Sequence, residues 1–262
     1  MVYKQIIVKS LINKITKKDY LFKGKYTVDP YQNCEFACSY CDSSFDPVIY
    51  VKSNGAQIFE KELETLPQGK IIIGSVHDPY QKAEEEFKIT QKILKIIVKK
   101  GFSCNILTKS DLILRDINLL KKIKNCNVTI SITSLDENVT NLFEKNVISS
   151  QRRLELIKTL NKNKIKTSLA IIPIIPYITD KELDLMVKKA NEHNSKNIVY
   201  KHLELKGDQK RIFLNLLEEH YPDLVENYST LYSDSFSPNK NYARLIKEKM
   251  EKIIFSFYPF QQ

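Results

Sequence analysis

Runs of isoleucine and valine without polar alternation recur along the chain after residue 25. Two clear cases are Ile71-Ile72-Ile73 and Ala170-Ile171-Ile172. Strands that are buried on both faces, as in parallel sheets, show this pattern. The pattern predicts six strands, at Lys25–Val28, Lys70–Gly74, Ser103–Leu107, Asn127–Ser131, Lys166–Ile171 and Asn197–Tyr200.

Helical periodicity fills the intervals between these strands. In Glu84–Lys100 apolar residues recur at helical spacing, and the segment ends at Gly101, a residue type that often follows a helix. Thr179 and Glu182 have the spacing of a capping box at the start of another helix. We expect helices over part of Ala56–Leu66 and over Glu84–Lys100, Leu112–Lys124, Ser150–Asn163 and Thr179–Asn194.

The repeated strand–helix order predicts an α/β fold with right-handed crossovers. Six strands favour a partial (β/α)6 barrel of the TIM type over the full eight-stranded barrel. With 262 residues, one main domain is expected. We predict an N-terminal extension at 1–24, the partial barrel at 25–201, and a C-terminal helical cap at 202–262. The cap should contain helices at Gly207–His220 and Asn241–Ile253 and an aromatic tail at Phe255–Phe260.

The composition limits the classes of partner and the cellular location that we expect for the protein. The formal net charge is +10 and the pI about 9.1. This charge fits a nucleic-acid partner, but lysines dispersed along helices fit a solvated surface equally well. The chain has no run of 18 apolar residues and no signal-peptide pattern at its start. We therefore expect a cytoplasmic protein without a membrane partner.

Three of the five cysteines, Cys34, Cys38 and Cys41, lie within eight residues. The odd total and this crowding argue against a disulfide framework and for a metal site. Structural zinc takes four ligands, and no fourth Cys or His follows at a suitable spacing. Three thiolates can instead hold three irons of a four-iron cluster and leave one iron open for chemistry. A zinc site with a distant ligand, and three unconnected thiols, are the alternatives.

The spacing Cys-x3-Cys-x2-Cys, with Tyr40 before the third cysteine, resembles the signature of the radical S-adenosylmethionine (SAM) superfamily. The similarity extends from Asp29 to about Leu245 and is strongest to the spore photoproduct lyase-like group, often labelled "DNA repair photolyase". The stretches that carry it are Asp29-Pro30-Tyr31 with the cysteines, Asp78-Pro79-Tyr80-Gln81, Leu107–Ser110 with Leu114-Arg115-Asp116, and Ile174-Ile175-Pro176 with Asp180.

This resemblance implies a [4Fe–4S] cluster on the three cysteines and SAM bound at the open iron. It also implies an electron donor such as flavodoxin or ferredoxin. Reductive cleavage of SAM would then give a 5′-deoxyadenosyl radical that abstracts hydrogen from a substrate. The resemblance does not identify that substrate, and a nucleic acid, a peptide and a small molecule all stay open.

The predicted strand ends supply candidate SAM contacts, since the C-terminal ends of barrel strands carry active sites. Glycine lets a backbone approach a ligand closely, and arginine can hold a carboxylate with two hydrogen bonds. Each residue also has an ordinary interpretation, such as a turn at Asp78-Pro79 or a surface arginine at 153. The candidates are Tyr40, Gly74, Ser75, Asp78, Lys109, Ser131 and Arg153.

Cys104 and Tyr80 are the candidates for a catalytic hydrogen donor or radical relay. A buried cysteine is more often a small apolar residue than a reactive thiol, so that interpretation stays open for Cys104. Two other function classes also stay open. One is a non-catalytic iron–sulfur protein for electron transfer or binding, and the other is a metal-stabilised nucleic-acid-binding module.

Overall fold

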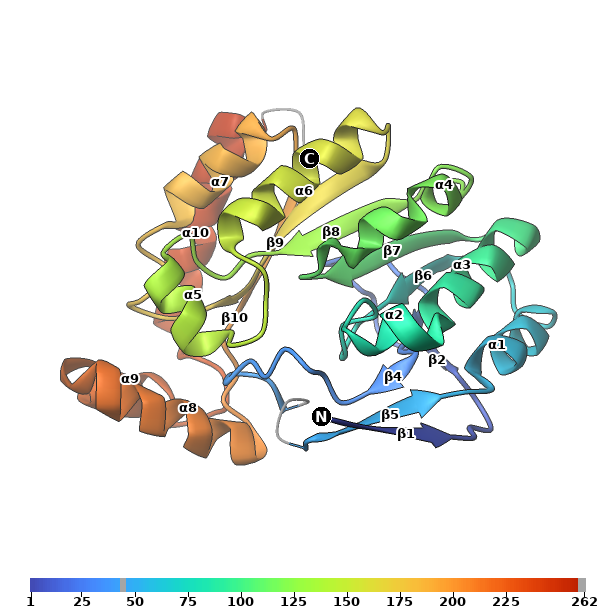
Figure 1. Ribbon diagram of the computed structural model, residues 1–262. Helices are drawn as coiled ribbons and strands as arrows, with labels where there is room; N and C mark the ends of the chain where they lie inside the picture. The colour runs from blue at the N-terminus through green and yellow to red at the C-terminus, as the bar shows by residue number, and fades with distance from the viewer. Residues whose placement is uncertain (43–45, 259–262) are drawn as a thin grey trace.

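A curved seven-stranded sheet forms the centre of the computed structural model, which describes residues 1–42 and 46–258 (Figure 1). Its strand order is β10-β9-β8-β7-β6-β3-β2, and every pair from β3 to β10 is parallel. All six predicted strands are present, and the predicted α/β partial barrel is confirmed. They are β3 (Tyr26–Val28), β6 (Lys70–Ile73), β7 (Ser103–Thr108), β8 (Asn127–Ser131), β9 (Lys166–Ile174) and β10 (Asn197–His202).

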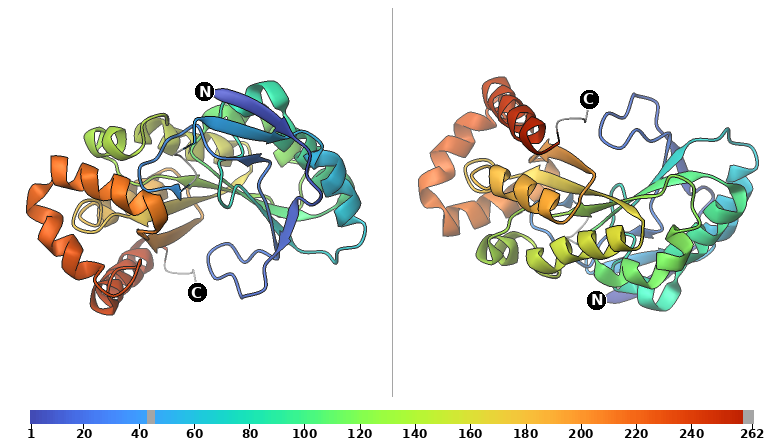
Figure 2. Two further views of the ribbon diagram at one scale, coloured as in Figure 1. Left: turned by 90° about the horizontal axis from the view of Figure 1, so that it is seen from below. Right: turned by 90° about the horizontal axis from the view of Figure 1, so that it is seen from above.

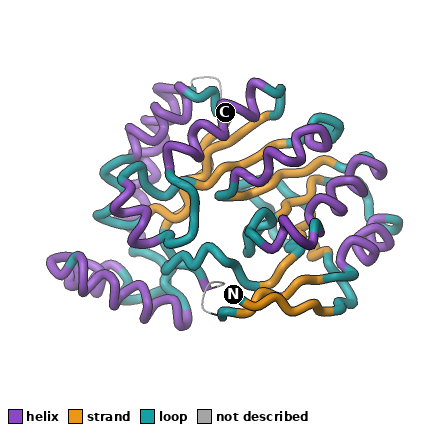
Figure 3. Tube along the Cα trace, viewed as in Figure 1, coloured by secondary structure: helices purple, strands orange, loops and turns teal. Residues whose placement is uncertain are grey.

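Helices line the outside of this sheet (Figure 3), and their buried apolar side chains belong to the same core as those of the strands. Ile93 and Ile97 of α3 are fully buried, as are Ile71, Val128 and Ile171 of the strands. Burial on this scale explains why the strands carry uninterrupted apolar runs. The helices of the barrel are α1 (Gly55–Leu63), α2 (Ala83–Phe87), α3 (Ile89–Lys100), α4 (Ile117–Leu120), α5 (Glu137–Phe143), α6 (Ser150–Lys162) and α7 (Leu183–Glu192).

Three of the predicted helices differ in detail from the observed ones. Lys88 has a left-handed backbone with φ of 54° and divides Glu84–Lys100 into α2 and α3. The segment Leu112–Lys124 is a 3₁₀ helix, η2 (Asp111–Asp116), followed by the single turn of α4. The prediction of a capping box at Thr179 and Glu182 is wrong, because α7 begins at Leu183. The Thr179 hydroxyl instead accepts a hydrogen bond from Ile175 N.

The N-terminal segment is part of the sheet system. Strand β2 (Ile12–Lys14) pairs antiparallel with β3 and extends the main sheet, although 1–24 was expected to lie outside the barrel. Strand β1 (Val2–Ile6) pairs with β5 (Val48–Lys52), which also pairs with β4 (Tyr31–Gln32) in a second, three-stranded sheet. Strand β2, with the sequence Ile-Asn-Lys, and the two-residue strand β4 are too short to show a period-2 apolar pattern in the sequence.

The C-terminal region is helical, as expected, and its helices (orange to red in Figure 2) follow β10, which lies at the opposite edge of the main sheet from β2. It contains α8 (Gly207–His220), η3 (Pro222–Leu224), α9 (Val225–Leu231) and α10 (Lys240–Phe257), and α10 packs on α7. The predicted aromatic tail starts inside α10, and its residues 259 and 260 lie outside the described residues. Within the described part of the chain, no helix is long and apolar enough to cross a membrane.

Candidate active site

The three clustered cysteines lie on the loop that follows β4, and hydrogen bonds fix this loop from one side. Glu35 N donates to Gln81 Oε1 at 3.0 Å, and Gln81 Nε2 donates to Asn33 O at 3.0 Å. The Glu35 carboxylate accepts a bond from Ala83 N at 2.7 Å. The loop is therefore tied to the segment between β6 and α2, which belongs to the barrel.

The turn after α5 fixes the same loop from the other side. Ser39 N donates to Phe143 O at 2.9 Å, and Asn146 N donates to Phe36 O at 3.2 Å. Cys38 forms an isolated antiparallel bridge with Glu144. Backbone contacts more than 100 residues apart in sequence thus hold the cysteine loop above the sheet.

A cavity of 470 Å³ opens between this loop and the carboxyl ends of the strands. Its volume lies within the usual range for small-molecule sites. Lys201–Glu204, Lys206 and Gln209 close one side, and Ile172 and Pro173 supply an apolar wall. Nine of the residues singled out from the sequence line the cavity together: Cys34, Cys38, Cys41, Tyr40, Gly74, Ser75, Asp78, Lys109 and Ser131.

Gly74, at the end of β6, has a backbone that requires glycine. Its φ is +82°, a region that residues with a side chain rarely adopt. A Cβ atom here would lie 2.4 Å from Pro79 Cδ and 2.7 Å from the Leu107 carbonyl oxygen. The glycine therefore lets the β6 loop pass close to β7 where both line the cavity.

Replacement of Gly74 by alanine should destabilise the protein by about 1–3 kcal/mol, the usual range for one strained backbone position. The clash with Leu107 O involves backbone, so a side-chain rotation cannot relieve it. Urea unfolding of Gly74→Ala measures the effect, and Gly101→Ala is the matched control. Gly101 also has a positive φ, of 71°, but a Cβ atom at that position would have no neighbouring atom within 4 Å. Equal losses in the two variants would contradict the close-approach argument.

Asp78 joins two strand ends. Its carboxylate accepts hydrogen bonds from Thr108 Oγ1 at 2.7 Å, Lys109 N at 2.7 Å and Tyr80 N at 2.9 Å. Burial raises the pKa of Asp78 despite these donors. The side chain lines the cavity, but its hydrogen bonds show that it also orders the loop, as the turn interpretation expected.

Asp29 has a similar role in the loop next to it. Its carboxylate accepts bonds from Ser75 Oγ at 2.9 Å, Val76 N at 3.0 Å and His77 N at 3.2 Å. Asp29 is buried and comes directly after β3. The Ser75 hydroxyl is thus already engaged by protein at the cavity wall.

Two of the three clustered thiols, those of Cys34 and Cys38, are buried. Burial, followed by the nearby charge of Asp78, raises the pKa of Cys34 to about 12. Burial and then Glu144 raise the pKa of Cys38 well above its usual value. Because metals bind thiolates, loading this site must release protons.

The donor set fits an iron–sulfur cluster. In residues 1–42 and 46–258, no three His, Cys, Asp or Glu side chains converge closely enough to share one metal ion. A cubane cluster does not require such convergence, because each cysteine ligates a different iron. Three thiols around one cavity, with no fourth thiol among its lining residues, therefore suit a cluster with one open iron.

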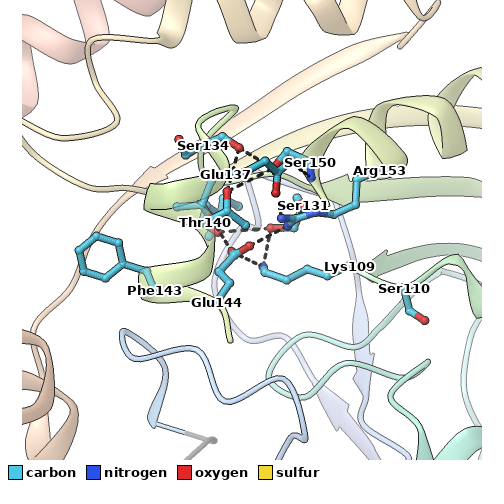
Figure 4. A network of polar contacts seen from close by, with 12 residues as sticks. Lys109, Ser110, Ser131, Ser134, Glu137, Thr140, Phe143, Glu144, Ser150 and Arg153 are labelled. Carbon is cyan, nitrogen blue, oxygen red and sulfur yellow. Dashed lines mark hydrogen bonds and ion pairs between the residues drawn. The ribbon is translucent and has the colours of Figure 1, made fainter. Parts of the chain in front are cut away.

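Glu144 is the centre of a buried polar network beside the cysteines (Figure 4). Its Oε1 atom accepts hydrogen bonds from Tyr40 OH and from Thr133 Oγ1, the latter at 2.8 Å, and lies 3.7 Å from Lys109 Nζ. Its Oε2 atom pairs with Arg153 NH1 at 2.8 Å. Burial alone would raise the pKa of Glu144, but Arg153 and Lys109 together lower it to about 2. The carboxylate is therefore charged at neutral pH.

Arg153 and Lys109 belong to this network, but they differ in their access to the cavity. Arg153 is fully buried, does not line the cavity, and donates to Ser131 O at 2.9 Å as well as pairing with Glu144. Lys109 lines the cavity and donates to Ser131 Oγ at 2.7 Å. Of the two basic candidates for SAM contact, the structure thus places Lys109 at the cavity and Arg153 behind its wall.

The two candidate catalytic residues lie away from the cavity lining. Tyr80 is buried, and its hydroxyl donates to Asp116 Oδ2 at 3.1 Å. Cys104 is buried in β7, with its sulfur 3.8 Å from that of Cys126. A catalytic role for either residue stays a prediction, and neither has direct access to the cavity in this structure.

Sequence reasoning missed Glu144, Thr133 as its partner, and the 201–209 wall. The helix α5 that leads to Glu144 has only seven residues, too few for a convincing periodic signal. The hydrogen bond from Tyr40 to Glu144 joins positions 104 residues apart. No local pattern could have brought these residues together.

A comparison with protein-family models now identifies the family. The model of the radical SAM superfamily matches residues 28–190, which run from the last residue of β3 through β9 and include all three clustered cysteines. The chain belongs to the radical SAM superfamily. It is therefore an enzyme of the radical SAM type, as the sequence resemblance predicted.

Known proteins with similar sequence or fold agree with this assignment. An uncharacterised protein of Methanocaldococcus jannaschii is 35% identical over 213 residues, covering 78% of this chain and 79% of that one. Spore photoproduct lyase complexed with dinucleoside spore photoproduct superposes with a TM-score of 0.74 at 16% identity, covering 98% of this chain and 80% of that one. A variant of that lyase with bound AdoMet and the dinucleoside gives a TM-score of 0.71 at 16% identity, covering 90% and 75%. At 16% identity the lyase structures confirm the fold of this protein, but they do not identify its substrate.

Proposed function

We propose that this protein carries a [4Fe–4S] cluster on Cys34, Cys38 and Cys41 and cleaves SAM reductively in the 470 Å³ cavity. The observation that carries the proposal is that three thiols from one loop share a cavity with polar strand ends. When bound, the reduced cluster would supply one electron to SAM, which would split into methionine and a 5′-deoxyadenosyl radical able to take a hydrogen atom from the substrate.

The residues of the cavity suit the different parts of SAM. Lys109 and Ser131 offer an ammonium and a hydroxyl for carboxylate or ribose oxygens, since their own bond of 2.7 Å holds both at the wall. Ile172 and Pro173 form an apolar surface that suits adenine. The loop at Gly74 and Ser75 leaves room for backbone contact with the amino acid end.

The partners follow from this chemistry. An electron donor of the flavodoxin or ferredoxin class has to reduce the cluster, which fits a cytoplasmic location. The substrate is unidentified, and a nucleic acid is the class favoured by the basic charge of +10. The likeness to spore photoproduct lyase, which was solved with a dinucleoside photoproduct, supports the same class by analogy of fold alone.

Anaerobic reconstitution with iron and sulfide tests the proposal. The reconstituted protein should bind iron and sulfide in equal amounts, and reductant plus SAM should release 5′-deoxyadenosine. A cluster that forms but never cleaves SAM would favour the electron-transfer alternative. Zinc bound in preference to iron would favour the metal-stabilised binding module.

Substitution of Lys109 by methionine should weaken SAM binding about 10- to 100-fold, the range for loss of a hydrogen bond to a charged group. Methionine keeps an unbranched side chain, one atom shorter than that of lysine, but removes the ammonium that faces the cavity. Equilibrium binding of SAM to the reconstituted protein measures the change, with iron content as a check on the cluster. Lys201→Met is the control, because Lys201 also lines the cavity but pairs with Glu204 at 2.7 Å. Equal weakening in both variants would contradict a specific role for Lys109.

A further inference from the structure

The positive charge of the chain is concentrated in three short segments. Residues 14–25, 121–127 and 161–166 together contain eleven lysines and one aspartate, a net charge of +10. The whole chain also has a net charge of +10, so the remaining residues are neutral in sum. The lysines of these segments are Lys14, Lys17, Lys18, Lys23, Lys25, Lys121, Lys122, Lys124, Lys162, Lys164 and Lys166.

The fold brings these segments to one end of the barrel. Residues 14–25 lead into β3, 121–127 lead into β8, and 161–166 lead into β9. The three strands are parallel members of one sheet, so their amino ends lie along the same edge. Lys121 Nζ donates to Asn163 Oδ1 at 2.9 Å, which joins two of the segments directly. We call residues 14–25, 121–127 and 161–166 the basic rim.

The basic rim lies at the opposite end of the strands from the cavity. Lys109 and Ser131 stand at or just beyond the carboxyl ends of β7 and β8, whereas the rim lies at the amino ends. In a six-stranded parallel barrel these are separate faces. The charge of the rim therefore has no part in holding SAM or the cysteine loop.

The lysines of the basic rim lack acidic partners, unlike many lysines elsewhere. All eleven are exposed, and none has an ion pair within the described part of the chain. The one rim carboxylate, Asp19, accepts bonds from the backbone N–H groups of Leu21, Phe22 and Gly24. By contrast, the ammonium groups of Lys99, Lys100, Lys189, Lys201, Lys206 and Lys247 each lie within 4.0 Å of a carboxylate.

Lysines near the carboxyl ends of helices are common, because they offset the helix dipole. That explanation applies to 121–124 and to Lys162, but not to 14–25, which connects two strands without a helix. This connection also presents Tyr20, which is 77% exposed and has Lys18 Nζ 5.1 Å from its ring centroid. An exposed ring among lysines suits a polyanion that also offers flat bases.

We propose that the basic rim binds the sugar–phosphate backbone of a nucleic acid, independently of the cluster and of SAM. Unpaired lysines attract phosphates through counterion release, which does not depend on base sequence. Tyr20 is the one large apolar or aromatic side chain of the rim that is strongly exposed, so the rim lacks the apolar face with which helices bind lipid surfaces. The rim anchors the nucleic acid on the face away from the reacting centre.

Binding of fluorescein-labelled mixed-sequence DNA to the cluster-free protein over a series of salt concentrations tests this proposal. Six rim lysines are changed to glutamine, which keeps the polarity of the side chains but removes six charges. We expect at least a tenfold rise in Kd and a fall of about two or more in the slope of log K against log salt, since each phosphate contact adds about 0.9 on duplex DNA. The substitutions are at Lys121, Lys122, Lys124, Lys162, Lys164 and Lys166.

The control variant removes the same number of charges from α7, the segment before it and the C-terminal helices. Its Kd should change far less than that of the rim variant, and both should unfold at the same urea concentration as the parent. Equal weakening in both variants, or an unchanged salt slope, overturns the proposal. Binding to phosphatidylserine vesicles without binding to DNA or RNA also overturns it. The control substitutions to glutamine are at Lys181, Lys188, Lys210, Lys240, Lys247 and Lys252.

This test is separate from that of the proposed enzyme activity. The cluster-free protein contains the complete rim, so a failure of SAM cleavage leaves the DNA-binding result intact. Conversely, the rim variant should still cleave SAM at the parent rate when no substrate is added, because the rim is distant from the cavity.

Discussion

Cys34→Ala protein should lose the iron–sulfur cluster and, with it, all formation of 5′-deoxyadenosine above background. Cys34 lies on the loop between β4 and β5, lines the cavity and is one of three thiols that can each hold one iron. With two cysteines left, two irons of the cubane lack protein ligands, and the cluster should be labile. Iron and sulfide analysis after anaerobic reconstitution measures the first effect, and chromatography of reductant-treated SAM mixtures measures the second.

Cys126→Ala is the matched control for this experiment. Cys126 is also buried, but it lies before β8 next to Cys104, away from the cavity lining. It should retain parent levels of iron and of 5′-deoxyadenosine, because its thiol has no access to the cluster loop. Parent-like cluster content in Cys34→Ala, or loss of the cluster in Cys126→Ala, would refute the assignment of ligands.

The sequence was sufficient to predict the parallel core of the fold. Its clearest strands contain uninterrupted apolar runs, as at Ile71-Ile72-Ile73 in β6, and such runs can be recognised one strand at a time. The edge strands were missed because β2, with the sequence Ile-Asn-Lys, exposes two of its three residues and has no local signature. The Thr179–Glu182 pair shows the same limit, since Glu182 instead accepts hydrogen bonds from Ser134 Oγ and Leu135 N.

The candidate site was predictable where its residues are local to a motif or a strand end. The cysteines, Gly74, Asp78, Lys109 and Ser131 all reach one cavity, since parallel strands end at the same edge. Arg153 lies on the helix that the sequence predicted, but its side chain pairs with the carboxylate of Glu144, which the sequence did not indicate. Glu144 directly follows a short helix, and its partners lie on four other segments of the chain. No local sequence pattern indicates that these segments meet.

Glu144→Leu should destabilise the protein by about 3–5 kcal/mol, because it leaves the buried guanidinium of Arg153 without its partner. Both side chains of this pair have no exposed area. Arg153→Leu should cost a similar amount, since it leaves a buried carboxylate with only Lys109 at 3.7 Å as a cationic neighbour. Urea unfolding of each variant measures these losses.

The double variant, Glu144→Leu with Arg153→Leu, decides whether the two residues act as a pair. Its loss should be at least about 1 kcal/mol smaller than the sum of the single losses, because neither the guanidinium nor the carboxylate is then left buried without the other. Additive losses would refute the pairing. The exposed pair of Glu60 and Lys99, which are 2.8 Å apart, is the control, and its single substitutions to glutamine should change the free energy of unfolding little.

Glu144→Gln separates the charge of this residue from its hydrogen bonds. An amide oxygen can still accept from Tyr40 OH and Thr133 Oγ1, so the cysteine loop should keep its anchor at Tyr40. The ion pairs with Arg153 and Lys109 are lost, which frees the Lys109 ammonium from its anionic neighbour at the cavity wall. We expect this variant to keep its cluster but to bind SAM with altered affinity, whereas Glu144→Leu should also lose iron during reconstitution. If both variants load iron like the parent, Tyr40 needs no carboxylate to hold the loop, and the anchoring role of Glu144 is refuted.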